Sequence, residues 1–233
     1  MRTAKTVLTV IQERGKQKKP IERVYKLLFN RELYLNAYAK LYPNNGAMTK
    51  GVTNETVDGM SIQKIDRMIE ILREEKYQWK PARREYIKKK NGKKRPLGIP
   101  VWGDKVLQEV MRQILEAYYE PQFSEHSHGF RPNRGCHTAL QEIQVWKGTR
   151  WFIEGDISQY FDTIDHKILL EILARNIHDG RFIRLVSNML EAGYLEEWKF
   201  KQTISGVPQG GVISPILANI CLLYTSPSPR DRG

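Results

Sequence analysis

Residues 85–99 constrain the fold more than any other part of the sequence, because two strand-like runs there are joined by Asn91-Gly92. Asn-Gly supplies the two left-handed backbone positions of a type I′ turn, the connection that suits a two-stranded antiparallel hairpin. Nine residues between 80 and 95 are Lys or Arg, against a single acid, Glu85. The sequence therefore predicts a β-hairpin with a strongly basic tip.

The basic side chains of this hairpin indicate a polyanion as partner. They are Lys80, Arg83, Arg84, Lys88, Lys89, Lys90, Lys93, Lys94 and Arg95. Each phosphate that such side chains neutralise releases condensed counterions, and the nearby Trp79, Tyr86 and Trp102 can add stacking. The alternative is a solvated hairpin whose lysines only protect a sheet edge from aggregation. We favour the polyanion, because so many like charges repel one another unless a partner offsets them.

The charge is divided unevenly along the 233 residues. Residues 1–100 carry 24 Lys and Arg against 10 Asp and Glu, a net +14, whereas residues 101–233 carry a net −2. With only two cysteines, and no apolar run approaching about 18 residues, an exported disulfide scaffold and a transmembrane protein are both excluded. The N-terminus does not have the pattern of a signal peptide, so we expect a cytoplasmic protein.

The remaining sequence predicts a mixed α+β fold in which helices outnumber strands. A turn cluster at residues 42–46 marks a boundary. Apolar spacing predicts helices from Ser61, over 104–119, 137–146, 166–177 and 180–192, and from Ser214-Pro215. Asp179 is the expected N-cap of the fifth of these, and Gly193 follows its end. Strands are expected at residues 151–157 and near 198–204.

Asp156 is the first candidate for chemistry, since it ends the apolar run 151–157, which we interpret as a buried strand. A carboxylate at that place suits Mg²⁺, which prefers oxygen ligands and keeps substrate phosphates in its coordination shell. The alternative is that Asp156 only caps a helix or forms a salt bridge. Spacing alone leaves both open.

Three further groups of residues are weaker signals. In the turn 206–211, glycines allow close backbone approach to a ligand and Gln209 can donate and accept, but a plain connector has the same pattern. Arg131 and Arg134 are expected to contact further phosphates. The group His126, His128, Cys136 and His137 does not have the spacing of a closed zinc site.

Taken together, several segments resemble one family, the reverse transcriptases encoded by bacterial group II introns, also called maturases. The resemblance is carried, in family order, by residues 94–100, 120–123, 127–132, 155–157, 161–166 and 206–215. It implies a right-hand polymerase fold with an N-terminal extension (1–50), fingers (51–150) and part of the palm (151–220). It also implies an RNA-directed DNA polymerase that uses an RNA template, a DNA primer and dNTPs, and that binds intron RNA in a ribonucleoprotein.

The resemblance assigns roles to single residues. Asp156 matches the first metal-binding aspartate, with the Ile157 carbonyl sharing the coordination of two Mg²⁺ ions, for which Mn²⁺ is a possible substitute. Phe161 matches the aromatic residue that disfavours a ribonucleotide 2′-OH. Lys94 and Arg95 lie where the fingers contact the triphosphate. Pro208, Gln209 and Gly210 match the loop that lines the nascent base pair.

The sequence departs from the family after residue 220. Residues 221–231 resemble the translation of a transposase-type sequencing adaptor, so we expect residues 221–233 to be a non-native tail without helical period. The expected hairpin bearing Tyr-Ala-Asp-Asp does not occur, nor does a thumb. A two-metal site needs carboxylates from two places, so we expect this chain to lack polymerase activity. The alternative function is an RNA-binding splicing cofactor that acts without DNA synthesis.

Overall fold

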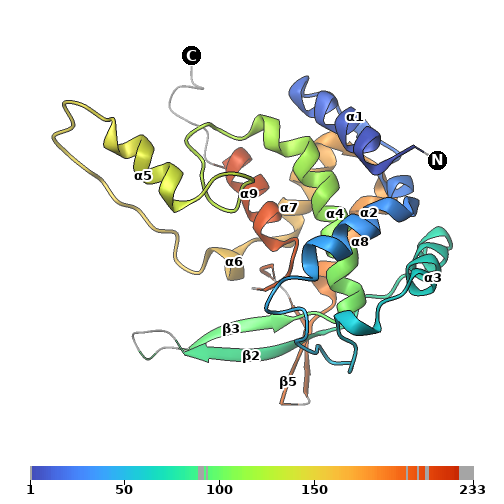
Figure 1. Cartoon of the computed structure of the whole chain (residues 1–233). Helices are drawn as coiled ribbons and strands as arrows, with labels where there is room; N and C mark the ends of the chain where they lie inside the picture. The colour runs from blue at the N-terminus through green and yellow to red at the C-terminus, as the bar shows by residue number, and fades with distance from the viewer. Residues whose placement is uncertain are drawn as a thin grey trace.

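In the computed structural model, one central helix organises the chain. The structure describes residues 2–88, 92, 94–197, 199–203, 205–207 and 210–225, with only the backbone of Thr225. The central helix is α4 (Trp102–Tyr119), and 13 of its 18 residues are buried, including the predicted stripe Val106, Val110, Ile114 and Tyr118. The sequence predicted this helix from residue 104, two residues late. Its burial on nearly every side, visible in Figure 1, makes it the core of the molecule.

The N-terminal segment packs on one side of α4. It forms α1 (Ala4–Lys16), the 3₁₀ turn η1 (Val24–Phe29), α2 (Arg31–Leu41), η2 (Val57–Gly59) and α3 (Ile62–Arg73). Thr3, Asn30 and Ser61 cap the three α-helices with their side-chain oxygens. Both α1 and α2 lie against α4, and α1 approaches so closely that Gly15 faces the Tyr118 carbonyl.

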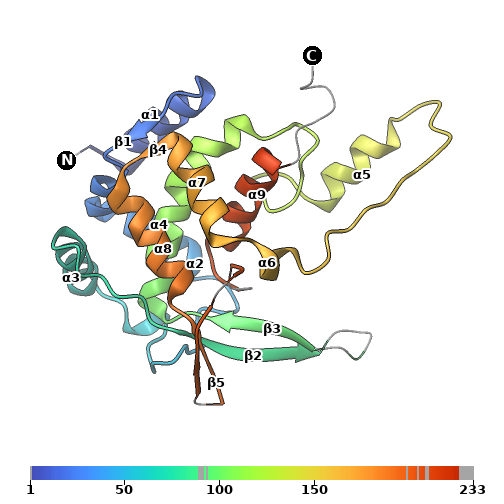
Figure 2. The ribbon, with the colours of Figure 1, turned by 180° about the vertical axis from the view of Figure 1, so that it is seen from behind.

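The later helices pack on the opposite side of α4 and join the N-terminal segment. They are α7 (His166–Asn176), α8 (Gly180–Glu191) and α9 (Ser214–Thr225). Strand β1 (Ile21–Glu22) pairs in parallel with β4 (Ile177–His178), as Figure 2 shows from behind. Asp179 caps α8 as predicted, and its second oxygen accepts the Tyr25 amide (2.9 Å). One hydrophobic cluster therefore extends from Ala4 to Cys221.

The predicted hairpin is confirmed and lies in a four-stranded sheet. Strands β2 (Ala82–Lys88) and β3 (Lys94–Ile99) are antiparallel, with Lys88 opposite Lys94 and Arg83 opposite Ile99. The order is β3-β2-β5-β6, with β5 (Tyr194–Glu196) parallel to β2 and antiparallel to β6 (Lys199–Lys201). The far half of the hairpin is exposed and projects from the body of the molecule (Figure 1).

An arm between residues 120 and 163 contains little regular structure. It comprises η3 (Glu120–Gln122), α5 (Cys136–Gln144) and the single turn α6 (Tyr160–Thr163). The predicted buried strand at residues 151–157 is wrong: this segment is extended but unpaired, and Trp151 and Ile153 are 86% and 93% exposed. A strand needs a neighbour for its backbone hydrogen bonds, and among the described residues no strand pairs with this one.

The prediction that residues after 220 have no helical period is also wrong for the first five of them. Helix α9 runs on to Thr225, Cys221 is buried, and Leu223 and Tyr224 pack against the core. Of the predicted strand near 198–204, β6 covers Lys199–Lys201, and Trp198 and Ile204 lie outside the described residues. No helix in the described part of the chain combines the length and the apolar character needed to cross a membrane.

Two carboxylates are buried in α4, and burial raises the pKa of both. Asp104 accepts hydrogen bonds from the Tyr77 hydroxyl (2.7 Å) and the Lys80 amide (3.0 Å), yet burial still raises its pKa to about 6. Glu109 pairs with Arg112 at 2.7 Å and is 1% exposed, and burial, together with Glu116, raises its pKa. Each of these buried carboxylates therefore has neighbours that donate hydrogen bonds to it, as buried charges require.

Replacing Gly15 with Ala should destabilise the protein by about 1–3 kcal/mol. The added Cβ would overlap the Tyr118 carbonyl oxygen and force α1 away from α4. Urea denaturation measures the change, with Gly46→Ala as control, because a Cβ at Gly46 meets no described atom within 4 Å. Equal midpoints for the two variants would show that α1 does not pack this closely.

The stability that Asp104 contributes should fall as the pH rises from about 4 to 6. Its folded pKa of about 6 lies above the usual value of 3.8, so the unfolded chain loses its proton first. Relative to Asp104→Asn, the wild type should lose up to about 3 kcal/mol across this window. Unfolding free energies of both proteins at several pH values measure the difference; a difference that does not change with pH contradicts the prediction.

Candidate nucleotide and nucleic-acid site

The turn that follows β6 contacts α6, the residue after α6, and β3. The Val207 amide donates to the Phe161 carbonyl, and the Gly206 amide donates to the Ile164 carbonyl, both at 2.8 Å. Further on, Gly210 lies against Leu97 and Gly98 of β3. The turn therefore connects α6 with the edge strand of the basic hairpin, and residues distant in sequence meet there.

Two glycines in this turn are required by its geometry. Gly206 and Gly210 have φ values of +87° and +105°, which side chains other than glycine's rarely adopt. A Cβ on Gly206 would lie 2.8 Å from the Asp162 carbonyl oxygen, and one on Gly210 would lie 2.7 Å from the Gly98 carbonyl oxygen. The glycines thus allow backbone to pack on backbone, which fixes where Gly206 and Gly210 lie.

Two side chains that sequence reasoning missed hold the turn at its ends. His166 Nε2 donates to the Gly206 carbonyl oxygen (2.7 Å). The buried side chain of Gln108, in α4, accepts the Val212 amide (2.9 Å). A polar Gln108 among the apolar residues of α4 is the one sign of this role in the sequence, and nothing there identifies Val212 as its partner.

Phe161, the expected sugar-contacting residue, lies beside this turn in α6. Its ring makes edge contacts with Phe130 (6.2 Å between centroids) and Tyr160 (6.0 Å). Phe130 is 69% exposed. An aromatic surface therefore lies next to the turn.

The basic side chains of the hairpin fall into two groups. Lys88, Lys94 and Arg95 are exposed near its tip. Arg83 is engaged at the base, where its guanidinium donates to the Lys50 carbonyl (3.0 and 2.9 Å). The Arg84 guanidinium lies over the Tyr194 ring, 3.7 Å from its centroid. Among the described basic residues of the two strands, those near the tip are thus the more exposed group.

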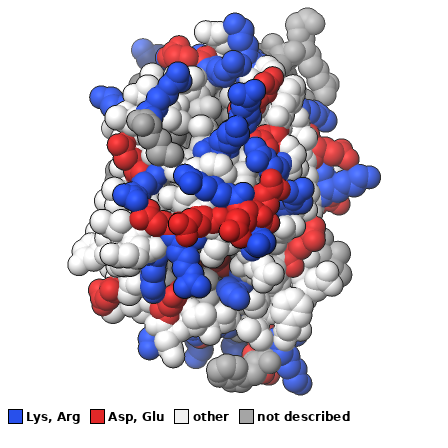
Figure 3. Space-filling view, turned by 90° about the vertical axis from the view of Figure 1, so that its right-hand side faces the viewer, with Lys and Arg blue, Asp and Glu red and all other residues white. Residues whose placement is uncertain are grey.

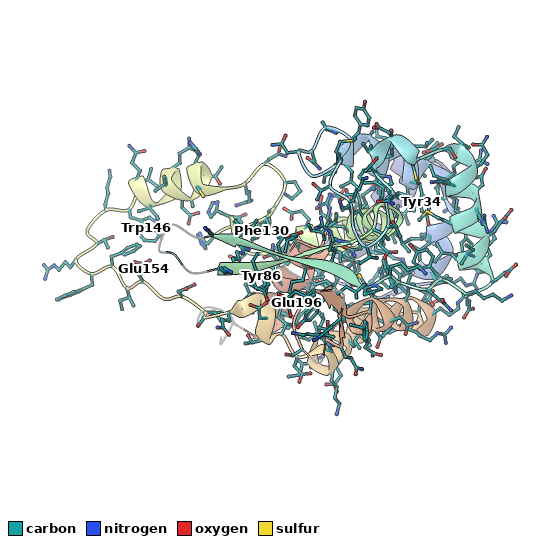
Figure 4. The ribbon with its side chains drawn as sticks, turned by 90° about the horizontal axis from the view of Figure 1, so that it is seen from below. Tyr34, Tyr86, Phe130, Trp146, Glu154 and Glu196 are labelled. Atoms are coloured by element: carbon teal, nitrogen blue, oxygen red, sulfur yellow. The ribbon has the colours of Figure 1, made fainter. Side chains whose placement is uncertain are left out.

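A polar chain links the hairpin to β5 and β6, as Figure 4 shows for Tyr86 and Glu196. The Tyr86 hydroxyl and the Lys201 ammonium both donate to the Glu196 carboxylate. These hydrogen bonds lower the pKa of Glu196 and raise that of Tyr86. These hydrogen bonds hold the hairpin in one orientation relative to β5 and β6.

The structure argues against a phosphate contact for Arg131. Its side chain is buried, and its guanidinium donates to both Glu120 oxygens and to the carbonyls of Ser124 (2.6 Å) and Ser127 (2.7 Å). Most of its donors are therefore used in closing the 120–131 loop. Arg134 donates to the Glu125 carbonyl in the same loop.

The histidines of this region hold a carboxylate. His126 Nδ1 and His128 Nε2 both bond to Glu142, and these hydrogen bonds lower the pKa of that carboxyl. Cys136 and His137, the other two residues of the group, are exposed. The group thus anchors α5 to residues 126–128.

Asp156 and Ile157, the expected metal ligands, lie in the exposed segment 151–157. A carboxylate and a backbone carbonyl are oxygen donors of the kind Mg²⁺ prefers. Among the described residues, however, no group of three or more His, Cys, Asp or Glu is placed to hold a metal ion. The donor type fits the metal, but a single carboxylate does not make a two-metal centre.

Five of the expected site residues cannot be placed. Lys89, Lys90, Lys93, Pro208 and Gln209 lie outside the described residues. The described neighbours on either side, Lys88 and Lys94 in the hairpin and Val207 and Gly210 in the turn, mark where these segments leave and re-enter the structure.

Comparison with known proteins gives the arrangement a family. Residues 87–231 match the family model "Reverse transcriptase (RNA-dependent DNA polymerase)", which covers more than half of the chain and includes β3, Asp156, Phe161 and the 206–211 turn. The chain belongs to the reverse transcriptase family. This confirms the resemblance stated from the sequence.

Among the curated relatives of this reverse transcriptase domain are proteins named for introns. It is 50% identical over 202 residues to the "Group II intron-encoded protein LtrA" of Lactococcus lactis subsp. cremoris, covering 86% of this chain and 34% of that protein. It is 48% identical over 227 residues to an "Uncharacterized 91 kDa protein in cob intron" of Schizosaccharomyces pombe, covering 94% and 28%. The chain thus spans about a third of the length of these relatives.

A solved structure supports the α+β fold. A chain of the "Partial Cas6-RT-Cas1--Cas2 complex" superposes with a TM-score of 0.56 at 20% identity, covering 85% of this chain and 34% of that one. At this identity the likeness concerns the fold alone. It agrees with the predicted α+β polymerase fold.

Replacing Gln108 with Met should loosen the turn while leaving the fold intact. Met has nearly the same volume but no acceptor for the Val212 amide, so we expect a loss of about 1–3 kcal/mol and faster hydrogen exchange in residues 210–213. Exchange measured by mass spectrometry tests this. In the control Gln113→Met, the lost bond is to the Leu33 carbonyl, so exchange around Val212 should not change. Equal exchange in both variants would show that Gln108 does not hold the turn.

Proposed function

We propose that the chain is the fingers and the first part of the palm of an RNA-directed DNA polymerase encoded by a group II intron. It would bind intron RNA, and also an RNA template with its DNA primer, through the tip of the β2–β3 hairpin. The proposal rests on the membership of the reverse transcriptase family and on the intron-encoded relatives. We also propose the division into residues 1–50, 51–150 and 151–220.

One observation carries the proposal. Residues that the family resemblance assigns to the incoming nucleotide come from separate parts of the sequence, and the structure brings their segments together. The turn 206–211 contacts the backbone of Phe161 on one side and Leu97 and Gly98 of β3 on the other. Lys94 and Arg95 begin the same strand β3. A nucleotide placed between these elements would meet basic, aromatic and backbone groups at once.

In this proposal the residues of the site have separate tasks. Lys88, Lys94 and Arg95 attract the phosphates, because their side chains are exposed and of one charge. Phe161 offers its ring to the sugar. Gly210 brings the backbone of the turn close to β3, where the template base would lie. Mg²⁺, when bound by Asp156 and by further carboxylates, would supply the charge stabilisation that phosphoryl transfer needs.

A second function is supported by a different observation. Strands β2 and β3 of the hairpin are paired from Arg83–Ile99 to Lys88–Lys94, whereas the segment that holds Asp156 is exposed and unpaired. RNA binding requires only the hairpin, so the chain can act as an RNA-binding splicing cofactor without DNA synthesis. The two functions make different demands on this polypeptide and can be measured separately.

RNA binding should depend steeply on salt through the hairpin tip. Replacing Lys88 and Lys94 together with Gln should reduce the slope of log K against log salt by about 1.5, since each single-strand phosphate contact contributes about 0.7. Filter binding of an RNA oligonucleotide at several salt concentrations measures it. The control Lys26→Gln with Lys167→Gln removes two exposed charges elsewhere and should leave the slope nearly unchanged. Equal slopes for both double variants would refute binding by the hairpin.

This polypeptide alone should not extend a primer in the presence of Mg²⁺ or Mn²⁺. The described residues place one aspartate, Asp156, in an exposed segment and group no further carboxylates with it. A primer-extension assay on an RNA template, with Asp156→Asn as control, tests this. Metal-dependent synthesis that Asp156→Asn abolishes would contradict the prediction and favour the polymerase over the cofactor.

A further inference from the structure

A cavity of about 450 Å³ lies at the base of the hairpin, apart from the turn 206–211. It is formed by residues 53–60, by α3 and the segment after it, and by the first turn of α4. Its volume falls within the range of small-molecule sites, which is about 300–1,000 Å³. Apart from Tyr77, Lys80, Trp102 and the buried Asp104, none of the residues that line it received a role above.

The inner surface of the cavity is mainly apolar. Met60, Met68 and Ile71 line it and are only partly buried, so their side chains leave apolar surface open to water. Val101 and Trp102 form the wall where α4 begins. Such a surface suits a flat, weakly polar group better than an extended charged one.

Two buried polar atoms on residues of this cavity have no hydrogen-bond partner within the described part of the chain. They are Thr53 Oγ1 and Trp102 Nε1, two of four such side-chain atoms there. A buried donor or acceptor left unpaired costs free energy, so these atoms are rare in folded proteins. Because both atoms are closed to water, they are not part of the water-accessible wall of the cavity.

The rim of the cavity is basic. Lys64, Arg67, Lys76 and Lys80 all line it, against Glu55 and Asp104. Lys64 pairs with Glu55 (3.1 Å), and Asp104 is satisfied by Tyr77 and the Lys80 amide. Arg67 is exposed and forms no ion pair with the described residues. Figure 3, which faces the side where α3 lies, shows Lys and Arg spread around a band of acidic side chains.

We propose that this cavity binds one nucleotide, with the base inside and its phosphate on the rim beside Arg67. The apolar surface accepts the face of the base. Unpaired bases of RNA are commonly recognised by burial of the base against side chains. The nucleotide belongs either to the RNA bound by the hairpin, in which case the inference rests on the proposed function, or to free nucleotide.

Gly103 gives a way to close the cavity without disturbing the fold. It lines the cavity, and a Cβ there would meet only the Met68 sulfur among described atoms, at 4.0 Å. Gly103→Leu fills the space, and Gly103→Ala adds one methyl group and leaves it open. Both replace a helical glycine, so both should fold at least as well as the wild type.

The experiment measures binding of a fluorescent single-stranded RNA, of an abasic oligonucleotide of equal length, and of AMP alone to the full chain. We expect Gly103→Leu to bind the RNA about tenfold more weakly than Gly103→Ala, with an unchanged salt slope. We expect the two variants to bind the abasic oligonucleotide equally. If the wild type binds AMP and Gly103→Leu does not, free nucleotide alone can occupy the cavity. If the wild type binds RNA but not AMP, the nucleotide in the cavity must be part of RNA.

Equal affinity of Gly103→Leu and Gly103→Ala for RNA and for AMP overturns the inference and leaves the proposed function standing, provided that the wild type binds RNA with a steep salt dependence. If the wild type binds neither RNA nor AMP, the inference about the cavity and the proposed function are both refuted. Should Gly103→Leu not fold, cross-linking of 4-thiouridine RNA to the wild type decides. Cross-links at Met60, Met68 or Trp102 support the cavity, and cross-links confined to residues 82–99 refute it.

Discussion

The structure depends on the burial of α4 on nearly every side. Its apolar residues join the N-terminal helices to α7, α8 and α9 in one core. The same helix carries Gln108, whose side chain accepts the Val212 amide, and its first residues follow directly on β3. The hairpin, the 206–211 turn and the core are therefore held to one another through a single rigid element. A rigid element of this kind is what a nucleotide site needs, since loops alone place side chains with less precision.

The proposed site has two halves, one for nucleic acid and one for metal, and they differ in how completely this chain forms them. The nucleic-acid half, made of the hairpin, the turn and Phe161, is held by backbone hydrogen bonds and by glycines that permit close packing. The metal half, around Asp156, lies in an extended segment beyond the core, where Trp151 and Ile153 are exposed. Figure 4 shows Trp146 and Glu154 in this arm, far from Tyr34 in the core. An exposed apolar segment of this kind has no strand paired with it among the described residues, so its apolar side chains stay open to water.

Much of the fold could be predicted from local signals. Asn91-Gly92 fixed the hairpin, Ser61 and Asp179 marked helix starts, and apolar spacing gave α3, α4, α7 and α8. Residues 151–157 were mispredicted because apolar content indicates burial only where a partner exists, and pairing is not a local property. For Arg131, charge alone predicted a phosphate contact, and the pairing of its guanidinium with Glu120 is not a local property of the sequence. Gln108 and His166 were missed, since their roles depend on contacts across 104 and 40 residues.

In the proposed function, the hairpin and the 206–211 turn act together as one nucleic-acid surface. Hydrogen exchange of the chain with and without an RNA template annealed to a DNA primer tests it most directly. We expect exchange to become slower in residues 94–99 and in residues 205–212, and to do so for both segments at the same concentration of nucleic acid. Protection limited to α1 and α2, or protection of the hairpin without the turn, would contradict it.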